Sequence, residues 1–368
     1  DWSYFTDFSF ELDSGGVDDR PLDNGSSVES LLYYDLGLSE DNVTFNLLPL
    51  ALDAFTFVRP VGLLDPLGGH TFPTSFGSFE LVDPESYPPR HDVFVPADGV
   101  IVEIAWYERE WPVGGRFIGT YNDFDVKIAH TKNVLSSIEH VSELSSTLQR
   151  EIGELSPGVN RLEIPVSLGD KLGLTGGRPR AQYTLNWRVF SRDISHFVNP
   201  ERYGLMAYEG HFLDYCSEGL QDMLLPRLSR TIEPRVGMFD FDEKGKLVGN
   251  WFHVEVNESD PTADSMSQLA FVYAVNEPES VRVSISGAIF NQVGVYSVYG
   301  SSPDPRFVSV DSGNVVFQLK AAPEWEGDFL REITLLVDVI DDERIRVEVF
   351  LGWFGSRVFS NNAMIFSR

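Results

Sequence analysis

Several segments of this chain alternate between apolar and polar side chains, which restricts the folds open to it. In residues 123–128, Phe124, Val126 and Ile128 alternate with charged residues. Because successive side chains of a strand point to opposite faces, this spacing predicts a strand with one buried and one solvated face. Residues 92–95 and 100–106 carry similar signals, and an aromatic content of 13% with 31 Gly and 21 Pro favours strands and turns. We therefore predict a mainly β protein.

Two segments predict helices instead. Residues 146–149 read STLQ, which has the form of a capping box, and Leu144, Leu148 and Ile152 recur every four residues. A second apolar stripe covers residues 211–225 and ends at Pro226. The second helix is expected to connect two β units.

The last hundred residues predict a β-meander. Its strands are expected at 281–285, 315–319, 333–340 and 345–351, with a polar turn at 341–344. A hairpin over residues 238–252, with its turn at 243–245, is expected to precede them. Such a meander closes into a small barrel or folds as a sandwich.

These elements divide the chain into four parts. We expect an N-terminal docking segment at 1–55, a β core at 56–200, a helical connector at 201–235 and a C-terminal β domain at 236–368. At about 150 residues per domain, such a length accommodates two β domains.

The charge balance excludes some partners. With 28 Lys and Arg against 56 Asp and Glu, the formal net charge is −28. Nucleic acids and anionic membranes bind Lys and Arg, so neither is expected as a partner, and no stretch approaches the roughly 20 apolar residues that span a bilayer. The single Cys makes no internal disulfide. Because the chain begins at Asp1 and is strongly acidic, we expect a secreted, periplasmic or extracellular protein whose leader has been removed.

Four segments carry a family resemblance. Residues 95–103 read VPADGVIVE and residues 166–177 read VSLGDKLGLTGG, with DVKIAH at 125–130 and SSIEHV at 136–141 between them. In this order the segments resemble the lysostaphin-type zinc metallopeptidases and their biotinyl/lipoyl-like barrel relatives. The resemblance implies a lysostaphin-like β barrel-sandwich core with few helices. It also implies that His140, at the end of a hairpin strand, lines the active groove.

The resemblance implies a zinc site as well, but the motifs depart from the family pattern. The family binds zinc through the His and Asp of H-x-G-x-D and the second His of H-x-H. Residues 69–75, GHTFPTS, retain His70 but have Thr74 in place of the Asp, and residues 184–187, TLNW, have Thr184 and Asn186 in place of the two His. A neutral Thr or Asn oxygen is a poor Zn²⁺ ligand beside a single imidazole. We therefore expect no bound cofactor, with His70 as the remaining ligand of the ancestral set.

Three functions are compatible with these residues. The leading hypothesis is a catalytically inactive secreted relative of the peptidases that binds an extracellular peptide, glycan or cell-wall ligand, or has a structural role. The alternative is an active zinc endopeptidase on peptidoglycan or peptide cross-links, drawing on His70, His140 and a further His, with His140 assisting catalysis. A third hypothesis is a glycan-binding or glycan-active protein, whose aromatic platform would consist of Trp106, Tyr107 and Trp111.

Three further features favour structural interpretations. Asp240, Asp242 and Gly245 resemble part of a calcium loop but lack the later Glu, so a polar turn is preferred. Cys216, on the apolar face of the second predicted helix, is interpreted as a buried small hydrophobe, and His130 as structural. The chain has no G-x-S-x-G elbow and no glycine-rich nucleotide motif, so neither an α/β-hydrolase nor a nucleotide-binding protein is indicated.

Overall fold

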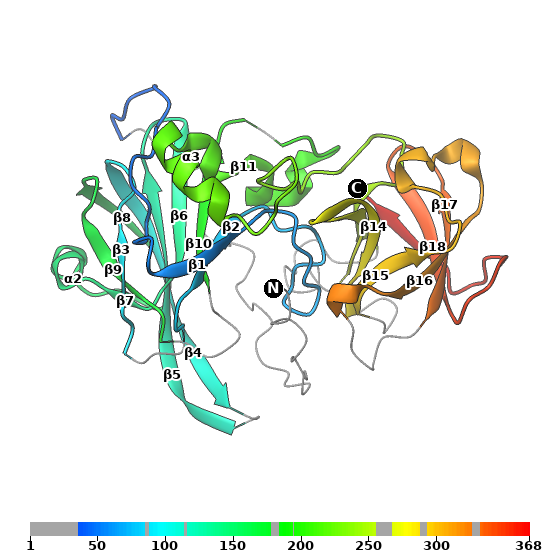
Figure 1. The fold of residues 1–368 in the computed structure, drawn as a ribbon, viewed down its shortest axis with the longest axis horizontal. Coiled ribbons are helices and arrows are strands. Elements are labelled where there is room, and N and C mark those ends of the chain that lie inside the picture. The colour runs from blue at the N-terminus through cyan, green and yellow to red at the C-terminus, as the bar shows by residue number, and fades with distance from the viewer. Residues whose placement is uncertain are drawn as a thin grey trace.

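The computed structural model describes residues 36–84, 88–113, 116–177, 184–193, 195–254, 267–287, 293–325 and 332–368. It contains two β-rich lobes that lie side by side (Figure 1). The predicted mainly β class is confirmed. Among the described residues, no helix combines the length and apolar character needed to cross a bilayer.

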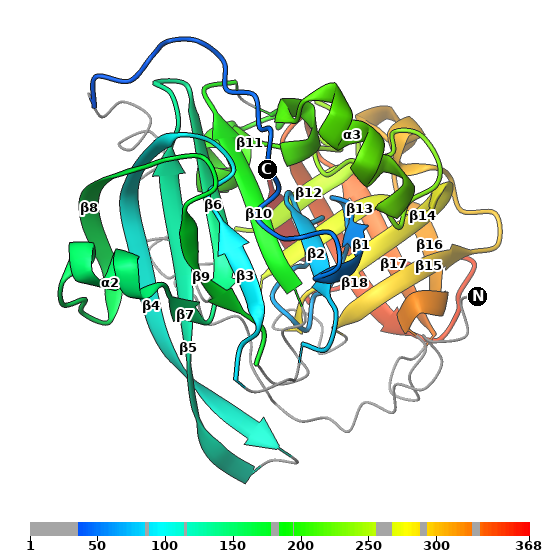
Figure 2. The ribbon, with the colours of Figure 1, turned by 60° about the vertical axis from the view of Figure 1, so that its left-hand side comes forward.

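The first lobe is built on a large antiparallel sheet and a small one. Its strands are β1 (Phe55–Arg59), β2 (Gly77–Leu81), β3 (His91–Phe94), β4 (Gly99–Val113), β5 (Arg116–Ala129), β6 (Val134–Val141), β7 (Glu143–Leu144), β8 (Gly158–Val166), β9 (Lys171–Thr175), β10 (Thr184–Ser191) and β11 (Glu209–Gly210). The large sheet has the order β1-β2-β10-β6-β5-β4-β8 with β11 beside β10, and the small sheet has the order β3-β9-β7. The long β4–β5 hairpin extends beyond the other strands of the lobe (Figure 2).

The apolar residues of the alternating segments form the core of this lobe, as predicted. Val126 and Ile128 are fully buried, and Trp187 of β10 lies in the same core with its ring stacked 4.7 Å from that of Phe212. Phe45 packs against Trp187 at a ring distance of 4.8 Å, so the described end of the N-terminal segment belongs to this core.

The polar side of β5 is not solvated, and this part of the prediction is wrong. Asp123 is 0% exposed, Asp125 8% and Lys127 7%. Lys127 Nζ lies 2.7 Å from a carboxylate oxygen of buried Glu103. A charge can be buried when it is paired, so ion pairs let this strand bury both faces.

The first predicted helix is confirmed as α2 (Ser146–Ile152), although its cap lies one residue earlier than expected. The Ser145 side chain accepts a hydrogen bond from the Leu148 amide, and Gly153 ends the helix with φ +74°. Gly adopts this left-handed conformation without a Cβ penalty, which explains the stop.

The second predicted helix, over residues 211–225, is wrong as one continuous element. It is divided into a 3₁₀ helix, η3 (Phe212–Tyr215), and α3 (Glu218–Leu224), with Cys216 in extended conformation between them. The Phe45 amide donates to the Tyr215 carbonyl at 2.8 Å, and the Ser217 amide donates to the Phe45 carbonyl at 2.9 Å. This tertiary pairing uses backbone groups that a continuous helix would need for itself. The remaining 3₁₀ helices are η2 (Pro200–Tyr208), η4 (Leu225–Arg227), η5 (Pro305–Phe307), η6 (Val310–Ser312) and η7 (Pro323–Trp325).

The second lobe is a closed barrel of consecutive antiparallel strands. They are β12 (Gly249–His253), β13 (Gln268–Ala274), β14 (Glu277–Ile285), β15 (Gly294–Tyr299), β16 (Val315–Ala321), β17 (Ile333–Val339), β18 (Arg344–Leu351) and β19 (Met364–Ser367). Pairing of β12 with β19 closes the ring. The predicted meander is confirmed, and of the two predicted forms the chain adopts the barrel.

The hairpin predicted over residues 238–252 does not form. Its second half is β12, which pairs with β13 and β19, while residues 238–242 are not a strand. Buried Asp242 instead accepts hydrogen bonds from the Asn250 amide at 2.8 Å and the Tyr203 hydroxyl at 3.0 Å. Gly245, with φ +72°, lies in a turn, in agreement with the structural interpretation of the Asp240–Gly245 sequence.

The two lobes share an apolar cluster. Phe72 lies between β1 and β2 of the first lobe, and its ring lies 4.9 Å from that of Phe252 in β12. Tyr203 of η2 and Ala270 of β13 belong to the same cluster. Because β13 alternates, Leu269 and Phe271 face the barrel interior while Ala270 faces this junction.

Cys216 is buried, and its chemistry follows from that environment. It is 6% exposed, and burial raises the pKa of its thiol from 9.0 to about 12. The thiolate is the reactive form, so we expect a disulfide reagent at pH 8 to modify the folded chain roughly a hundredfold more slowly than the chain unfolded in urea. Stopped-flow absorbance of the released chromophore measures both rates. Equal rates would contradict the buried position.

Candidate functional site

A network of polar and charged side chains lies on the face of the large sheet opposite Trp187. Arg188, which follows Trp187 in β10, is central to it. Its Nη1 donates to Glu139 of β6 at 3.1 Å, and its Nε donates to Glu209 of β11. The Ser75 hydroxyl donates to the other Glu209 oxygen. The network therefore joins β6, β10 and β11.

Arg188 compensates two carboxylates that are almost completely buried. The side chains of Glu139 and Glu209 are 5% and 1% exposed, and that of Arg188 is 19% exposed. Burial raises the pKa of Glu209 above its ordinary value of 4.5, and Arg188 opposes that rise. The guanidinium also lies over the ring of Phe76, 5.3 Å from its centre.

Asn186 extends this network at the position where the resemblance implies a zinc-binding His. Its amide oxygen accepts hydrogen bonds from the hydroxyls of Ser78, at 2.9 Å, and Thr184, at 3.1 Å. Its Nδ2 donates to Glu139 at 3.2 Å. The two predicted H-x-H positions, Thr184 and Asn186, therefore bond to each other and to neighbouring polar groups.

The other predicted ligand positions, Thr74 and His70, have contacts with neighbouring segments. Thr74 accepts a hydrogen bond from the Leu63 amide at 3.1 Å, and it is Ser78 of β2 that lies beside Asn186. His70 exchanges two backbone hydrogen bonds with Asp65, and its ring lies edge-on to Phe76 at 5.7 Å. Thr74 is thus engaged with the backbone of the segment before it, and Ser78 takes the place beside Asn186. The zinc ligand set of the family does not fit the residues around Asn186.

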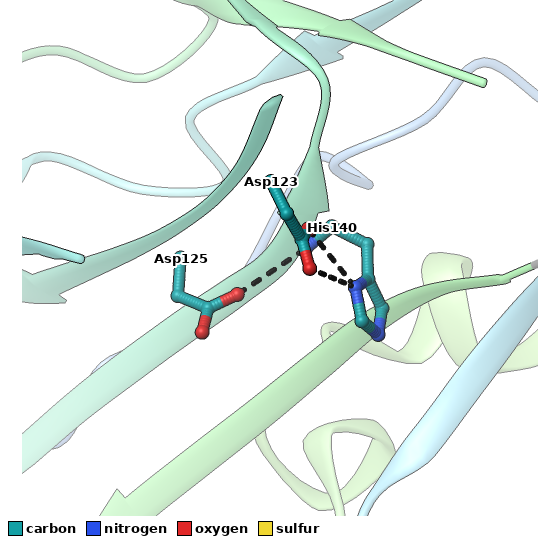
Figure 3. Close-up of side chains that lie close together, drawn as sticks. All are labelled: Asp123, Asp125 and His140. Carbon is teal, nitrogen blue, oxygen red and sulfur yellow. Dashed lines mark hydrogen bonds and ion pairs between the residues drawn. The ribbon is translucent and has the colours of Figure 1, made fainter. Parts of the chain in front are cut away.

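His140 belongs to a second group, which contains Asp123 and Asp125 of β5 (Figure 3). The β5–β6 pairing places Phe124 opposite Val141 and Val126 opposite Ile138, so Asp125 faces a bulge of two residues that includes His140. Bulges re-aim side chains, and His140 has a φ of +72°, which is uncommon for a residue with a side chain. Local backbone geometry thus positions this imidazole.

Hydrogen bonds define the geometry of this group. His140 Nδ1 donates to the carboxylate of Asp123, with distances of 3.1 and 3.3 Å to its two oxygens. The His140 amide donates to Asp125 at 3.4 Å, and its carbonyl accepts from the Thr175 hydroxyl at 2.7 Å. Arg109 Nε lies 3.4 Å from Asp123. The ring, the amide and the carbonyl of His140 are therefore all fixed by hydrogen bonds.

The three side chains bring together donor atoms that bind metals. One imidazole nitrogen and one oxygen from each carboxylate all lie within 4.8 Å of one another. The sequence predicts a role for His140, but Asp123 and Asp125 were expected on the solvated side of a strand. The sequence pattern that could have indicated all three is D-x-D close to a hairpin His, and D-x-D alone is common in alternating strands.

Two of the three predicted platform residues, Trp106 and Tyr107, contact other side chains of the same lobe. Trp106 stacks on Phe124 at 6.2 Å and donates to Asn122 at 3.0 Å, while the guanidinium of Arg109 lies over the Tyr107 ring at 5.1 Å. The third platform residue, Trp111, has its side chain outside the part that the structure describes. These contacts support packing for Trp106 and Tyr107.

His130 is consistent with the structural role expected for it. Its Nδ1 donates to the Asp98 carbonyl at 2.9 Å, and its Nε2 accepts from the Ser136 hydroxyl at 2.7 Å. Burial lowers the pKa of this imidazole to about 4, so it is neutral at physiological pH.

The chain was compared with known families, curated proteins and solved structures. The chain matches no family model, no curated protein and no solved structure.

Proposed function

We propose that the first lobe is a lysostaphin-like module without the zinc chemistry of the peptidases, and that it binds an extracellular peptide, glycan or cell-wall ligand. The hydrogen bonding of Asn186 is the observation that carries this proposal. Its amide oxygen already accepts two hydrogen bonds, and its nitrogen is a donor. Replacement of a His by such a group removes the imidazole nitrogen whose electron pair would bind zinc.

Charge also disfavours zinc at this position. Arg188 follows Asn186 by two residues in the same strand, so both side chains lie on one face of the sheet. Arg is cationic at all physiological pH values and would repel a divalent ion placed beside Asn186. The ion pairs with Glu139 and Glu209 hold it there.

The charge of the whole chain indicates what kind of ligand it favours. A net charge of −28 attracts positively charged groups and repels polyanions. Peptides and cell-wall polymers that carry free amino groups meet this requirement. We expect binding to weaken as salt concentration rises, because salt screens interactions between exposed charges.

Incubation of the purified chain with insoluble peptidoglycan tests both halves of the proposal. We expect the chain to sediment with the polymer at low salt, without release of soluble fragments or new amino groups, whether or not zinc is added. Bovine serum albumin, another acidic protein, is the control for non-specific sedimentation. Release of amino groups that a chelator abolishes would establish the endopeptidase alternative, and failure to sediment would contradict binding to this class of ligand.

A further inference from the structure

We infer that Asp123, Asp125 and His140 form a binding site for a divalent transition-metal ion of the zinc and manganese type. The site lies on β5 and at the bulge of β6, apart from the Asn186 positions that the resemblance singled out. Their donor atoms lie within 4.8 Å of one another, and all three residues are at least nine-tenths buried. An ion at the centre of such a group would reach one nitrogen and two oxygens after small side-chain shifts.

The donor set determines which ion fits. An imidazole nitrogen with two carboxylates suits Zn²⁺ and Mn²⁺, whereas Ca²⁺ and Mg²⁺ take oxygen ligands almost exclusively. The imidazole of His140 therefore disfavours Ca²⁺ and Mg²⁺ at this site. Its Nδ1 is the ring nitrogen that faces Asp123, so Nδ1 is the expected ligand atom, and the ring then carries its proton on Nε2.

Charge supports the inference. Two carboxylates held close together in a buried site repel each other and require positive charge nearby. Arg109 Nε lies 3.4 Å from Asp123 and supplies positive charge there, and a divalent ion would add to it. The guanidinium also competes with the ion for Asp123, so we expect weaker binding than in a zinc site built from three His.

The bound ion would have a defined effect on the fold. It would tie β5 to β6 at the bulge and offset the conformational cost of the positive φ at His140. This role requires no catalysis and is independent of the proposed binding function. A cation at this site is therefore compatible with either outcome of the peptidoglycan experiment.

Calorimetric titration of the metal-free full chain with ZnCl₂, and separately with MnCl₂, tests the site. We expect one saturable site in the wild type and at least tenfold weaker binding in Asp125→Asn, which is nearly isosteric and removes one anionic ligand. Asp311→Asn is the matched control, because Asp311 is exposed in η6 of the barrel and the charge change is the same. Equal affinity in Asp125→Asn and wild type, or no saturable binding by the wild type, would overturn the inference.

A second measurement observes the imidazoles of the wild-type chain directly. In the wild-type chain labelled with ¹⁵N at His, zinc should shift the Nδ1 resonance of one imidazole, assigned by its loss in His140→Asn. Asn tolerates the left-handed backbone of this position better than most residues, so this variant should fold. A zinc-dependent shift confined to other imidazoles would place the metal elsewhere and refute the site.

Discussion

Replacement of Arg188 by Met is expected to lower the free energy of unfolding by about 3–5 kcal/mol. The substitution leaves two carboxylates buried without the guanidinium that bonds to both of them, Glu139 and Glu209. Because Met fills a similar volume, the loss of stability is expected to come from the unpaired buried carboxylates and not from a cavity. Urea unfolding followed by tryptophan fluorescence measures the change.

Lys171→Met is the matched control for this variant. Lys171 pairs with Asp92 at 2.7 Å in the same lobe, but both side chains are more than 40% exposed. An exposed pair contributes at most about 1 kcal/mol, so this variant should unfold near the wild-type urea concentration. Similar losses in the two variants would show that the Arg188 network has no special role in stability.

The effect of Arg188→Met should depend on pH. Burial raises the pKa of Glu209 above 4.5 even with Arg188 present, and removal of Arg188 should raise it further. The folded state then binds this proton more tightly than the unfolded state does, so stability falls as pH rises from about 4.5 through the folded pKa. We expect the gap between wild type and variant to widen from pH 4.5 to pH 7. A gap that does not change with pH would argue against a stranded Glu209 charge.

Replacement of Arg368 by Leu is expected to cost the barrel a comparable amount, about 3–5 kcal/mol. Arg368 is 2% exposed, and its guanidinium donates to the carbonyls of Glu243 at 2.7 Å, Lys246 at 2.6 Å and Val248 at 3.0 Å. It also lies over the Trp251 ring, 3.8 Å from the centre. Leu would remove the guanidinium donor from each of these carbonyls.

Asp242 adds an electrostatic part to this loss. Burial raises the pKa of Asp242, and the nearby Arg368 charge opposes that rise. Differential scanning calorimetry of the variant should show a lower melting temperature for the barrel. Arg368→Lys should fall between wild type and Leu, since an ammonium keeps the charge but cannot span the same carbonyls.

The control in the barrel is Arg344→Leu. Arg344 pairs with Asp341 at 2.6 Å, with side chains 57% and 42% exposed. This variant removes the same charge from an exposed position, so its melting temperature should stay close to that of the wild type. An Arg368→Leu variant that melts like the control would refute the buried role of Arg368.

Parts of the candidate site could be predicted from the sequence. The hairpin that ends at His140 and the adjacency of Thr184 and Asn186 follow from local strand patterns and from the family resemblance. The spacing from His70 predicts Thr74 as the partner of Asn186, whereas the structure places Ser78 there, because pairing of β2 with β10 determines which residues meet. Glu209 could not be found, since it lies 134 residues from Ser75 and 21 from Arg188.

The sequence by itself determined the β class, the first helix and the meander of the second lobe, because alternation, caps and turns are local properties of the chain. Only the tertiary structure decided that the barrel closes, that the segment 211–225 is divided, and that the polar face of β5 is buried. Alternation shows that the two faces of a strand differ in polarity, but not what covers them. A charged face is buried where distant residues supply opposite charges, as Glu103 does for Lys127.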